Sequence, residues 1–361
     1  NAKSTTTGTL GQFIPAVPFG NFVGVGGPLL TLQQIAQSAD YRLNLGLVEA
    51  AGKPSGANVT VFDGGGSKLL DFPVALKAGE QQQLNGFLAA SGITLTNGHI
   101  EVKPFTGDGK ITAYASVVDS KSGDPILVAG VPAGSGANRF VVPGVADLNS
   151  GSASWRSDVR ILNGGTTPQT ATLTFYPIGG AASSAQSVTV NPGEVAALDD
   201  ILHSLFGITN AGGTLHVTTA ANAPLVVSAR TFDQTTDGTL GQFIPAVTPA
   251  DAVGLGDRAL QLVQVEDSVR FRTNFGIVET TGKPATAEVA VFLPDSKVQP
   301  KVQISLAPFE SKQFPIISSL GLGNTYNARI SVKVIDGDGR ITAYGSVIDQ
   351  TTQAPTYVPA Q

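Results

Sequence analysis

Gly8-Thr9-Leu10-Gly11-Gln12-Phe13-Ile14-Pro15-Ala16-Val17 recurs letter for letter at residues 238–247 of this 361-residue chain. Looser copies end in Val131-Pro132-Ala133 and Val358-Pro359-Ala360. The shared prolines therefore fall at 15, 132, 245 and 359, with steps of 117, 113 and 114 residues. Self-similarity at a fixed period is the mark of a tandem repeat. Four copies of this strand stand beside three copies of everything else, so we expect residues 1–17 to be an extra strand from a unit that is otherwise absent.

Two further anchors phase the repeat. An aromatic residue followed by arginine occurs at Tyr41-Arg42, Trp155-Arg156 and Phe271-Arg272, with steps of 114 and 116 residues. An aspartate after an apolar run occurs with the same steps, at Asp119, Asp233 and Asp349. These anchors divide the chain into an N-terminal strand, 1–17, and three repeats, 18–134, 135–247 and 248–361.

Each repeat reads mostly as β-strands. Apolar residues alternate with other residues at period two, as at Val59 and Val61 or Leu173 and Phe175, which is typical of half-buried strands. Glycine and proline turn signals separate the runs, and this pattern predicts an all-β chain of three tandem antiparallel sandwiches. One short amphipathic helix interrupts each repeat, and its apolar stripe is clearest at Leu198, Ile201, Leu202 and Leu205. We expect Asp199 and Asp200 in its first turn and Gly207 at its end.

Composition excludes several classes of function. Charged residues make up 14% of the chain and the net charge is −5, without a lysine and arginine cluster to neutralise phosphates, so we expect no nucleic-acid partner. No apolar run reaches 18 residues, so we expect no membrane span. The chain has no cysteine and no methionine, which excludes disulfides and suits an oxidising, extracellular location. The missing initiator methionine indicates a processed chain or a fragment.

The most regular polar feature is an arginine followed two residues later by aspartate or asparagine on one strand face. It occurs as Arg42 with Asn44, Arg156 with Asp158 and Arg272 with Asn274. Such a pair could bind a ligand, or it could hold a neighbouring loop by hydrogen bonds. We favour the second interpretation, because a feature repeated in every unit of an array usually serves the architecture.

Two sets of residues are candidate metal ligands. Asp336 and Asp338, in Asp336-Gly337-Asp338-Gly339, are calcium candidates, but a hairpin turn explains Asp-Gly equally well. The three histidines, His99, His203 and His216, have no metal-binding spacing, and His216 is expected on the outer face of a strand. We therefore expect no catalytic residue, no cofactor and no enzyme activity.

The combination of motifs resembles a repeat found in C-terminal or stalk regions of secreted and surface-exposed bacterial proteins. The middle repeat carries it best, with Trp155-Arg156-Ser157-Asp158, Pro192-Gly193-Glu194, Phe232-Asp233 and residues 241–246. The resemblance implies an immunoglobulin-like extracellular module. It implies a location and a class, and no ligand.

Two classes of function follow. The first is a structural subunit of a surface filament, stalk or layer that self-associates into a homopolymer, because an unpaired apolar strand is a template for sheet addition. The candidate intersubunit residues are Leu10, Gln12, Phe13, Ile14 and Val17. Against donation, each repeat already owns a closing strand, so residues 1–17 could instead be the stump of a lost domain or the first strand of repeat one. The second class is an adhesion or binding region of a larger secreted protein such as a hydrolase, with surface glycans or other surface proteins as partners.

Overall fold

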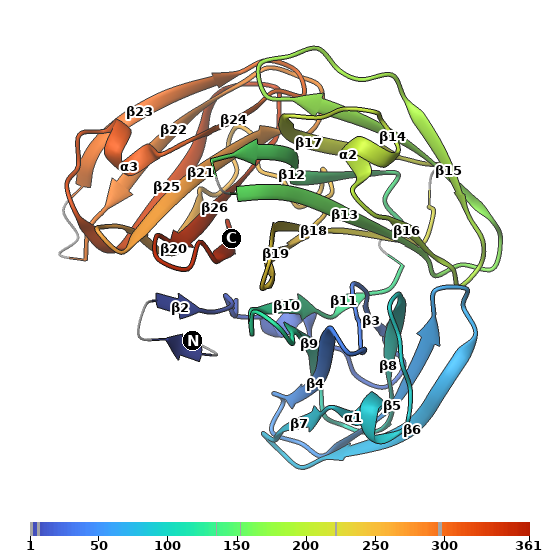
Figure 1. The fold of residues 1–361 in the computed structure, drawn as a ribbon. Coiled ribbons are helices and arrows are strands. Elements are labelled where there is room, and N and C mark those ends of the chain that lie inside the picture. Colours follow the sequence, from blue (N-terminus) through green and yellow to red (C-terminus); the bar gives the residue numbers. More distant parts are fainter. Residues whose placement is uncertain (1–2, 6–7, 135, 152, 221, 295–297) are drawn as a thin grey trace.

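The computed structural model describes residues 3–5, 8–134, 136–151, 153–220, 222–294 and 298–361. Strands account for 58% of the protein and helices for 4%, so the prediction of an all-β fold is confirmed. The strands pair antiparallel. Each of residues 18–134, 135–247 and 248–361, called here the first, second and third units, contains one large buried apolar cluster. The units follow one another around a common centre (Figure 1).

The first unit is built from two sheets, with strand orders β10-β9-β4-β7 and β11-β3-β8-β5-β6. Its strands are β3 (Leu30–Leu32), β4 (Tyr41–Glu49), β5 (Ser55–Asp63), β6 (Lys68–Leu76), β7 (Gln81–Asn85), β8 (Gly98–Gly107), β9 (Ile111–Asp119), β10 (Pro125–Ala129) and β11 (Val131–Pro132). The alternating side chains of β4 and β5, such as Leu45 and Val59, are fully buried in one cluster. Period-two alternation therefore places one face of each sheet in the core.

The second unit differs in that one long strand joins its two sheets. Its strands are β12 (Arg139–Ser150), β13 (Ala153–Asn163), β14 (Gln169–Pro177), β15 (Gln186–Val190), β16 (Val195–Leu198), β17 (Ala211–Thr218), β18 (Leu225–Thr235) and β19 (Gly238–Pro245). β12 pairs first with β17 and, near its end, with β13. A register shift between Val142 and Val145 marks an irregularity of the kind that bends a strand from one sheet toward another.

The third unit again has two separate sheets, ordered β20-β25-β22-β23 and β24-β21-β26-β27. Its strands are β20 (Leu260–Asp267), β21 (Phe271–Glu279), β22 (Ala285–Phe292), β23 (Val298–Leu306), β24 (Ser311–Phe314), β25 (Thr325–Gly337), β26 (Ile341–Asp349) and β27 (Pro355–Pro359). Every unit has a closing strand, β10, β19 or β27, that forms a hairpin with the strand before it.

Each predicted helix is present but spans a single turn: α1 (Phe87–Ala90), α2 (Ile201–Ser204) and α3 (Ile316–Ser319). The predicted stripe was too long, since Leu198 belongs to β16 and pairs with Val159. Asp199 and Asp200 precede α2 and do not form its first turn, so that expectation was wrong. One turn has little stability of its own, and sheet hydrogen bonds took the preceding residues. Gly207 follows at φ +65°, and its N–H donates to His203 O.

The strand pairing corrects one step of the repeat alignment. Pro245 lies opposite Ser228 and Pro359 opposite Tyr344, but the corresponding residue of the first unit is Ala129, opposite Tyr114. Pro132 lies three residues further on and pairs with Leu30 of β3. The looser copy ending in Pro132 was therefore out of register.

The repeated stretch adopts two conformations. Residues 238–245 form all of β19, whereas residues 8–17 contribute only β2 (Gly8–Leu10), which pairs with β1 (Lys3–Thr5). A strand needs a neighbour for its hydrogen bonds, and β19 has β18 along its whole length. No described residue from 11 to 17 pairs into the sheets of the first unit, so this segment is not a first strand of that unit.

Candidate functional site: the central junction

Four segments converge at the centre of the molecule, which we call the central junction. A small cavity of about 30 Å³ is lined by three consecutive residues from each segment: 11–13, 125–127, 241–243 and 355–357. The positions are equivalent, because Pro125, Gly241 and Pro355 each lie opposite the residue that precedes an anchor aspartate. The extra N-terminal segment thus takes a fourth place beside the three closing strands.

Asp119 fastens the second unit to the first at this junction. Its Oδ2 accepts hydrogen bonds from the backbone N–H of Thr239 at 2.9 Å and from Thr239 Oγ1 at 2.7 Å. Its Oδ1 accepts from the N–H groups of Lys121 and Ser122 in its own turn, and Ser122 Oγ donates to Thr239 O at 2.7 Å. A buried carboxylate with four donors is the strong form of such a contact.

Asp349 binds the N-terminal segment in the same way. Its Oδ2 accepts from Thr9 N–H and Thr9 Oγ1, both at 2.8 Å, while its Oδ1 accepts from Thr351 and Thr352 N–H. Thr352 Oγ1 donates to Thr9 O at 2.9 Å, as Ser122 does to Thr239. Thr9 and Thr239, which hold the same place in the two identical stretches, therefore make equivalent contacts on different units.

The same hydrogen bonds control both aspartate pKa values. Burial alone would raise the pKa of Asp119 and of Asp349. The hydrogen bonds from the bound threonine and from each aspartate's own turn outweigh that effect, so both pKa values lie below the ordinary value. Both carboxylates are thus stabilised as charged acceptors.

The glutamines of the two identical segments reach the opposite neighbours. Ser116 Oγ of the first unit donates to Gln12 Oε1 at 3.2 Å, and Ser346 Oγ of the third unit donates to Gln242 Oε1 at 3.0 Å. The N-terminal segment therefore contacts the third unit through Thr9 and the first unit through Gln12. β19 contacts the same two units from the other side, the first through Thr239 and the third through Gln242. The order around the junction is N-terminal segment, third unit, second unit, first unit (Figure 1).

Aromatic side chains follow this order. Phe13 packs against the core of the third unit, Tyr357 of the third unit against that of the second, and Phe243 of the second unit against that of the first. The N-terminal segment and the closing strands of the third and second units thus each cover the next core around the ring.

One residue breaks the pattern of the junction. Leu10, Leu240 and Ala354 form a small buried cluster, and the first unit has Asp124 at the position of Leu240 and Ala354. Asp124 is 2% exposed, and its Oδ2 accepts from Gly241 N–H at 2.7 Å. Burial raises the pKa of Asp124 to about 7, although the Gly241 bond and Arg230 oppose the shift.

Replacing Asp124 with asparagine should therefore change how stability depends on pH. A raised folded-state pKa means that unfolding becomes easier as pH rises from about 4, the pKa of an unfolded aspartate, to about 7. Asp124→Asn keeps a side-chain oxygen and cannot ionise, so we expect it to remove this decline and to add about 2 kcal/mol at pH 8. Urea unfolding between pH 5 and 8 measures it. The exposed Asp108→Asn variant is the control, and parallel wild-type and Asp124→Asn profiles would contradict the assignment.

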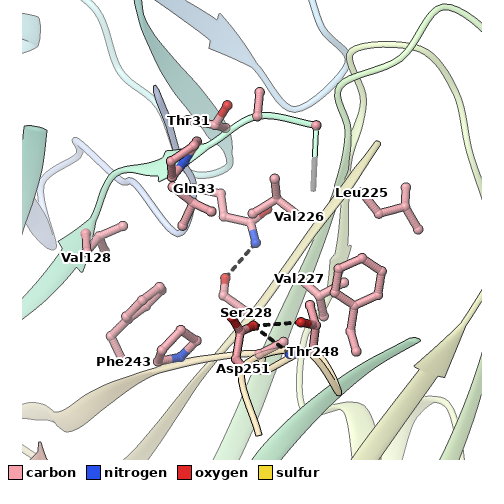
Figure 2. A pocket seen from close by; sticks show the side chains of 18 of the residues that line it. Thr31, Gln33, Val128, Leu225, Val226, Val227, Ser228, Phe243, Thr248 and Asp251 are labelled. Carbon is pink, nitrogen blue, oxygen red and sulfur yellow. Dashed lines mark hydrogen bonds between the residues drawn. The ribbon is translucent and has the colours of Figure 1, made fainter. Parts of the chain in front are cut away.

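A cavity of about 400 Å³ lies at the contact between the first and second units (Figure 2). Its wall is largely apolar and includes Val128, Val227 and Phe243. Gln33 is 2% exposed; its Nε2 donates to Ser228 Oγ at 2.7 Å, and its Oε1 lacks a hydrogen-bond partner among the described residues. This cavity is the place with the best shape for a small ligand.

The contact between the second and third units is aromatic. Phe309 lies 5.0 Å from both the Tyr176 and His216 rings, and Arg139 stacks over Phe309. His216 is on the outer face of its sheet, as expected, but the third unit covers it, so it is 4% exposed. Burial lowers the pKa of His216 to about 3, which keeps the imidazole neutral.

The predicted polar pairs occupy different surroundings. Asn44 Oδ1 accepts from Gly86 N–H and Asp158 Oδ1 from Asp200 N–H, so both hold the entry to a helix. The third unit has Pro315 at this point, which has no N–H to donate. The arginines diverge: Arg42 is exposed, Arg156 pairs with Asp147 at 3.3 Å, and Arg272 lines a second cavity of about 310 Å³.

The aromatic positions that recur in the three units lie at the edges of the cores. Tyr41, Trp155 and Phe271 are half-buried. Tyr41 OH accepts from Arg230 at 3.1 Å across the first contact between units, and Trp155 lines the cavity that Arg272 also lines. These residues therefore serve contacts between units as well as their own cores.

The calcium candidates lie in a connection between two sheets. Asp336 is in β25 and Asp338 follows it, and the chain then passes to β26 of the other sheet, so this is not a hairpin. Gly337, at φ +91°, and the Gly339 N–H bond to Pro284 O shape the turn. Within the described ranges, no three His, Asp or Glu side chains are grouped to hold a metal ion.

Comparison with known proteins gives little further information. No protein-family model and no curated protein matches the chain. Among solved structures, the chain is similar to Thermotoga maritima 1070, with 16% identity, 32% of this chain and 96% of that chain covered, and a TM-score of 0.27. It is also similar to Bacteroides uniformis beta-glucuronidase 2, with 12% identity, 69% and 26% coverage, and a TM-score of 0.13. At these TM-scores neither likeness informs the fold or the function.

No helix in the described part of the chain is long and apolar enough to cross a membrane.

Proposed function

We propose that this protein is a non-enzymatic structural protein of the bacterial cell surface, a subunit of a filament, stalk or surface layer. Its three units would be immunoglobulin-like sandwiches that form one rigid block. The low charge content, the absence of cysteine and methionine and the resemblance of the repeat motifs support the extracellular setting. The fastening of each closing segment to a neighbouring unit supports the structural role.

One observation carries the proposal. Ile14 is 70% exposed, and Val17, Phe19 and Val25, further along the same segment, are 37%, 52% and 53% exposed. A run of exposed large apolar side chains on a segment that is itself held in place is typical of an interaction site. The block thus offers a fixed apolar segment for assembly.

Removal of residues 1–17 tests the structural role. We expect the purified protein to form filaments or ordered arrays, and the variant lacking residues 1–17 to remain as single particles, because the apolar strand is gone. Electron microscopy of both proteins at equal concentration is the measurement. Circular dichroism must show retained β-structure in the shortened chain, and unchanged arrays without residues 1–17 would sink the proposal.

The second candidate is an adhesion or binding region of a larger secreted protein. The cavity of about 400 Å³ between the first two units favours it, since buried Gln33 and Ser228 place polar groups on an apolar wall (Figure 2). A glycan-array signal that Gln33→Leu abolishes would support this function over a purely structural one.

A further inference from the structure

We propose that residues 8–17 are the closing strand of a fourth β-sandwich of the same repeat, which fills the fourth position around the central junction and is carried by the polypeptide that enters β1. This inference is independent of the assembly role proposed above, because a strand that closes a fourth sandwich of its own polypeptide is no longer offered to a second copy. Three units and the N-terminal segment already occupy the four positions, and the β1–β2 hairpin stands alone in the fourth (Figure 1).

The burial of one equivalent position carries the proposal. Val128, Ile244 and Val358 occupy the same place in the three closing strands, opposite Ala115, Ala229 and Gly345. Each of the three is 1% exposed and belongs to the core of its own unit. Ile14 is the counterpart of Ile244 in an identical ten-residue stretch, yet it is 70% exposed. Ile14 is thus a core residue whose core lies outside the described residues.

The N-terminal hairpin repeats the register of a complete unit. Thr5 lies opposite Gly8 and Lys3 opposite Leu10. In the second unit, Thr235 lies opposite Gly238 and Asp233 opposite Leu240. β1 therefore occupies the place of the last residues of β18.

The packing around the ring leaves one closing strand without a core to cover. Phe13, Phe243 and Tyr357 each cover the core of the next unit. Leu127 holds the equivalent position in the first unit and is half-buried, but no core cluster of the described residues includes it. A fourth sandwich in the open position would provide the core that Leu127 covers. It would also bury Ile14 as a residue of its own closing strand.

A second copy of the chain fits this position less well. A sandwich can accept Ile14 in its core only if its own closing strand is absent. The first, second and third units all have that strand in place, as β10, β19 and β27. A copy would have to release one of these strands first, whereas a unit joined through β1 uses residues 8–17 as its own.

Thiol labelling tests the proposal, because the protein contains no cysteine. Ile14→Cys is introduced into the full chain and into a fusion in which a copy of residues 138–237 is joined directly to Gly8, so that the junction repeats Asp237–Gly238. We expect maleimide to label the thiol rapidly in the full chain, kept dilute so that it is unassembled, and at least about 100-fold more slowly in the fusion, where opening of the fourth core would limit the reaction. Small-angle scattering of the fusion should fit a compact ring of four bodies.

A second fusion serves as the control. In it, residues 138–247 precede Asn1 through a flexible linker, so the added body has its own closing strand and the Ile14→Cys thiol should stay reactive. Equal labelling in both fusions overturns the proposal, as does an added body that folds only with its own strand. Protection in the full chain alone, with dimers in light scattering, would assign the strand to a second copy and overturn it too. Protection in the first fusion, together with no filaments of the full chain in the microscope, would refute the filament and leave the ring intact.

Discussion

Replacing Ile244 with alanine should lower the free energy of unfolding of the second unit by about 3 kcal/mol, whereas Ile14→Ala should change stability by less than about 0.5 kcal/mol. The two residues lie in identical ten-residue stretches, so local propensity is matched. Ile244 is 1% exposed in the core of the second unit, and its truncation leaves a cavity. Ile14 is 70% exposed and buries little surface.

The single tryptophan makes this comparison practical. Trp155 lies in β13 of the second unit, so its fluorescence follows the unit that contains Ile244. Urea titrations of wild type, Ile14→Ala and Ile244→Ala, read by this fluorescence, give the three midpoints. Equal midpoint shifts for the two variants would mean that residues 8–17 are packed as residues 238–247 are, contrary to the structure.

Asp119→Ala should cost about 3 kcal/mol and loosen the contact between the first and second units. The substitution leaves Thr239 N–H, Thr239 Oγ1 and the N–H groups of Lys121 and Ser122 without their acceptor in a buried place. Amide exchange of Thr239 should rise together with the loss of stability. Thermal unfolding with hydrogen exchange measures both effects.

Asp349→Ala is the matched variant, because its carboxylate makes the same four bonds but holds only the N-terminal segment. We expect faster exchange at Thr9 and a smaller loss of global stability than for Asp119→Ala. If Asp119→Ala leaves both exchange at Thr239 and the unfolding temperature unchanged, the aspartate is not the fastening point of the two units.

Much of the fold could be predicted from periodicity and spacing. Alternation at positions such as Val59 and Val61 identified strands because each sheet has one buried face. The helices were harder, since Leu198 fits a helical stripe equally well but gains a full set of sheet hydrogen bonds with β13. The identical stretches show the limit of local prediction, because only residues 238–245 have a partner strand along their length.

The junction was only partly visible in the sequence. Asp119, Asp233 and Asp349 recur at regular steps, which phased the repeat but did not indicate what the carboxylates bind. Asp119 and Asp349 receive a threonine from another segment, whereas Asp233 accepts from Ser154 N–H of its own unit. The difference lies in the third unit, which is the neighbour of Asp233. At the position equivalent to Thr239 the third unit has Gln353 in place of a threonine. Contacts between units depend on which segments meet in space, and sequence spacing does not report that.

The bond between Thr9 and Asp349 joins residues that are 340 positions apart in the chain. A ribosome makes the threonine long before the aspartate, and local contacts within each unit form faster than one that closes so long a loop. Residues 8–10 must therefore wait, with Leu10 uncovered, until the third unit has folded. This segment is synthesised long before its partner, and that interval is when the protein is most exposed to misassembly with its neighbours.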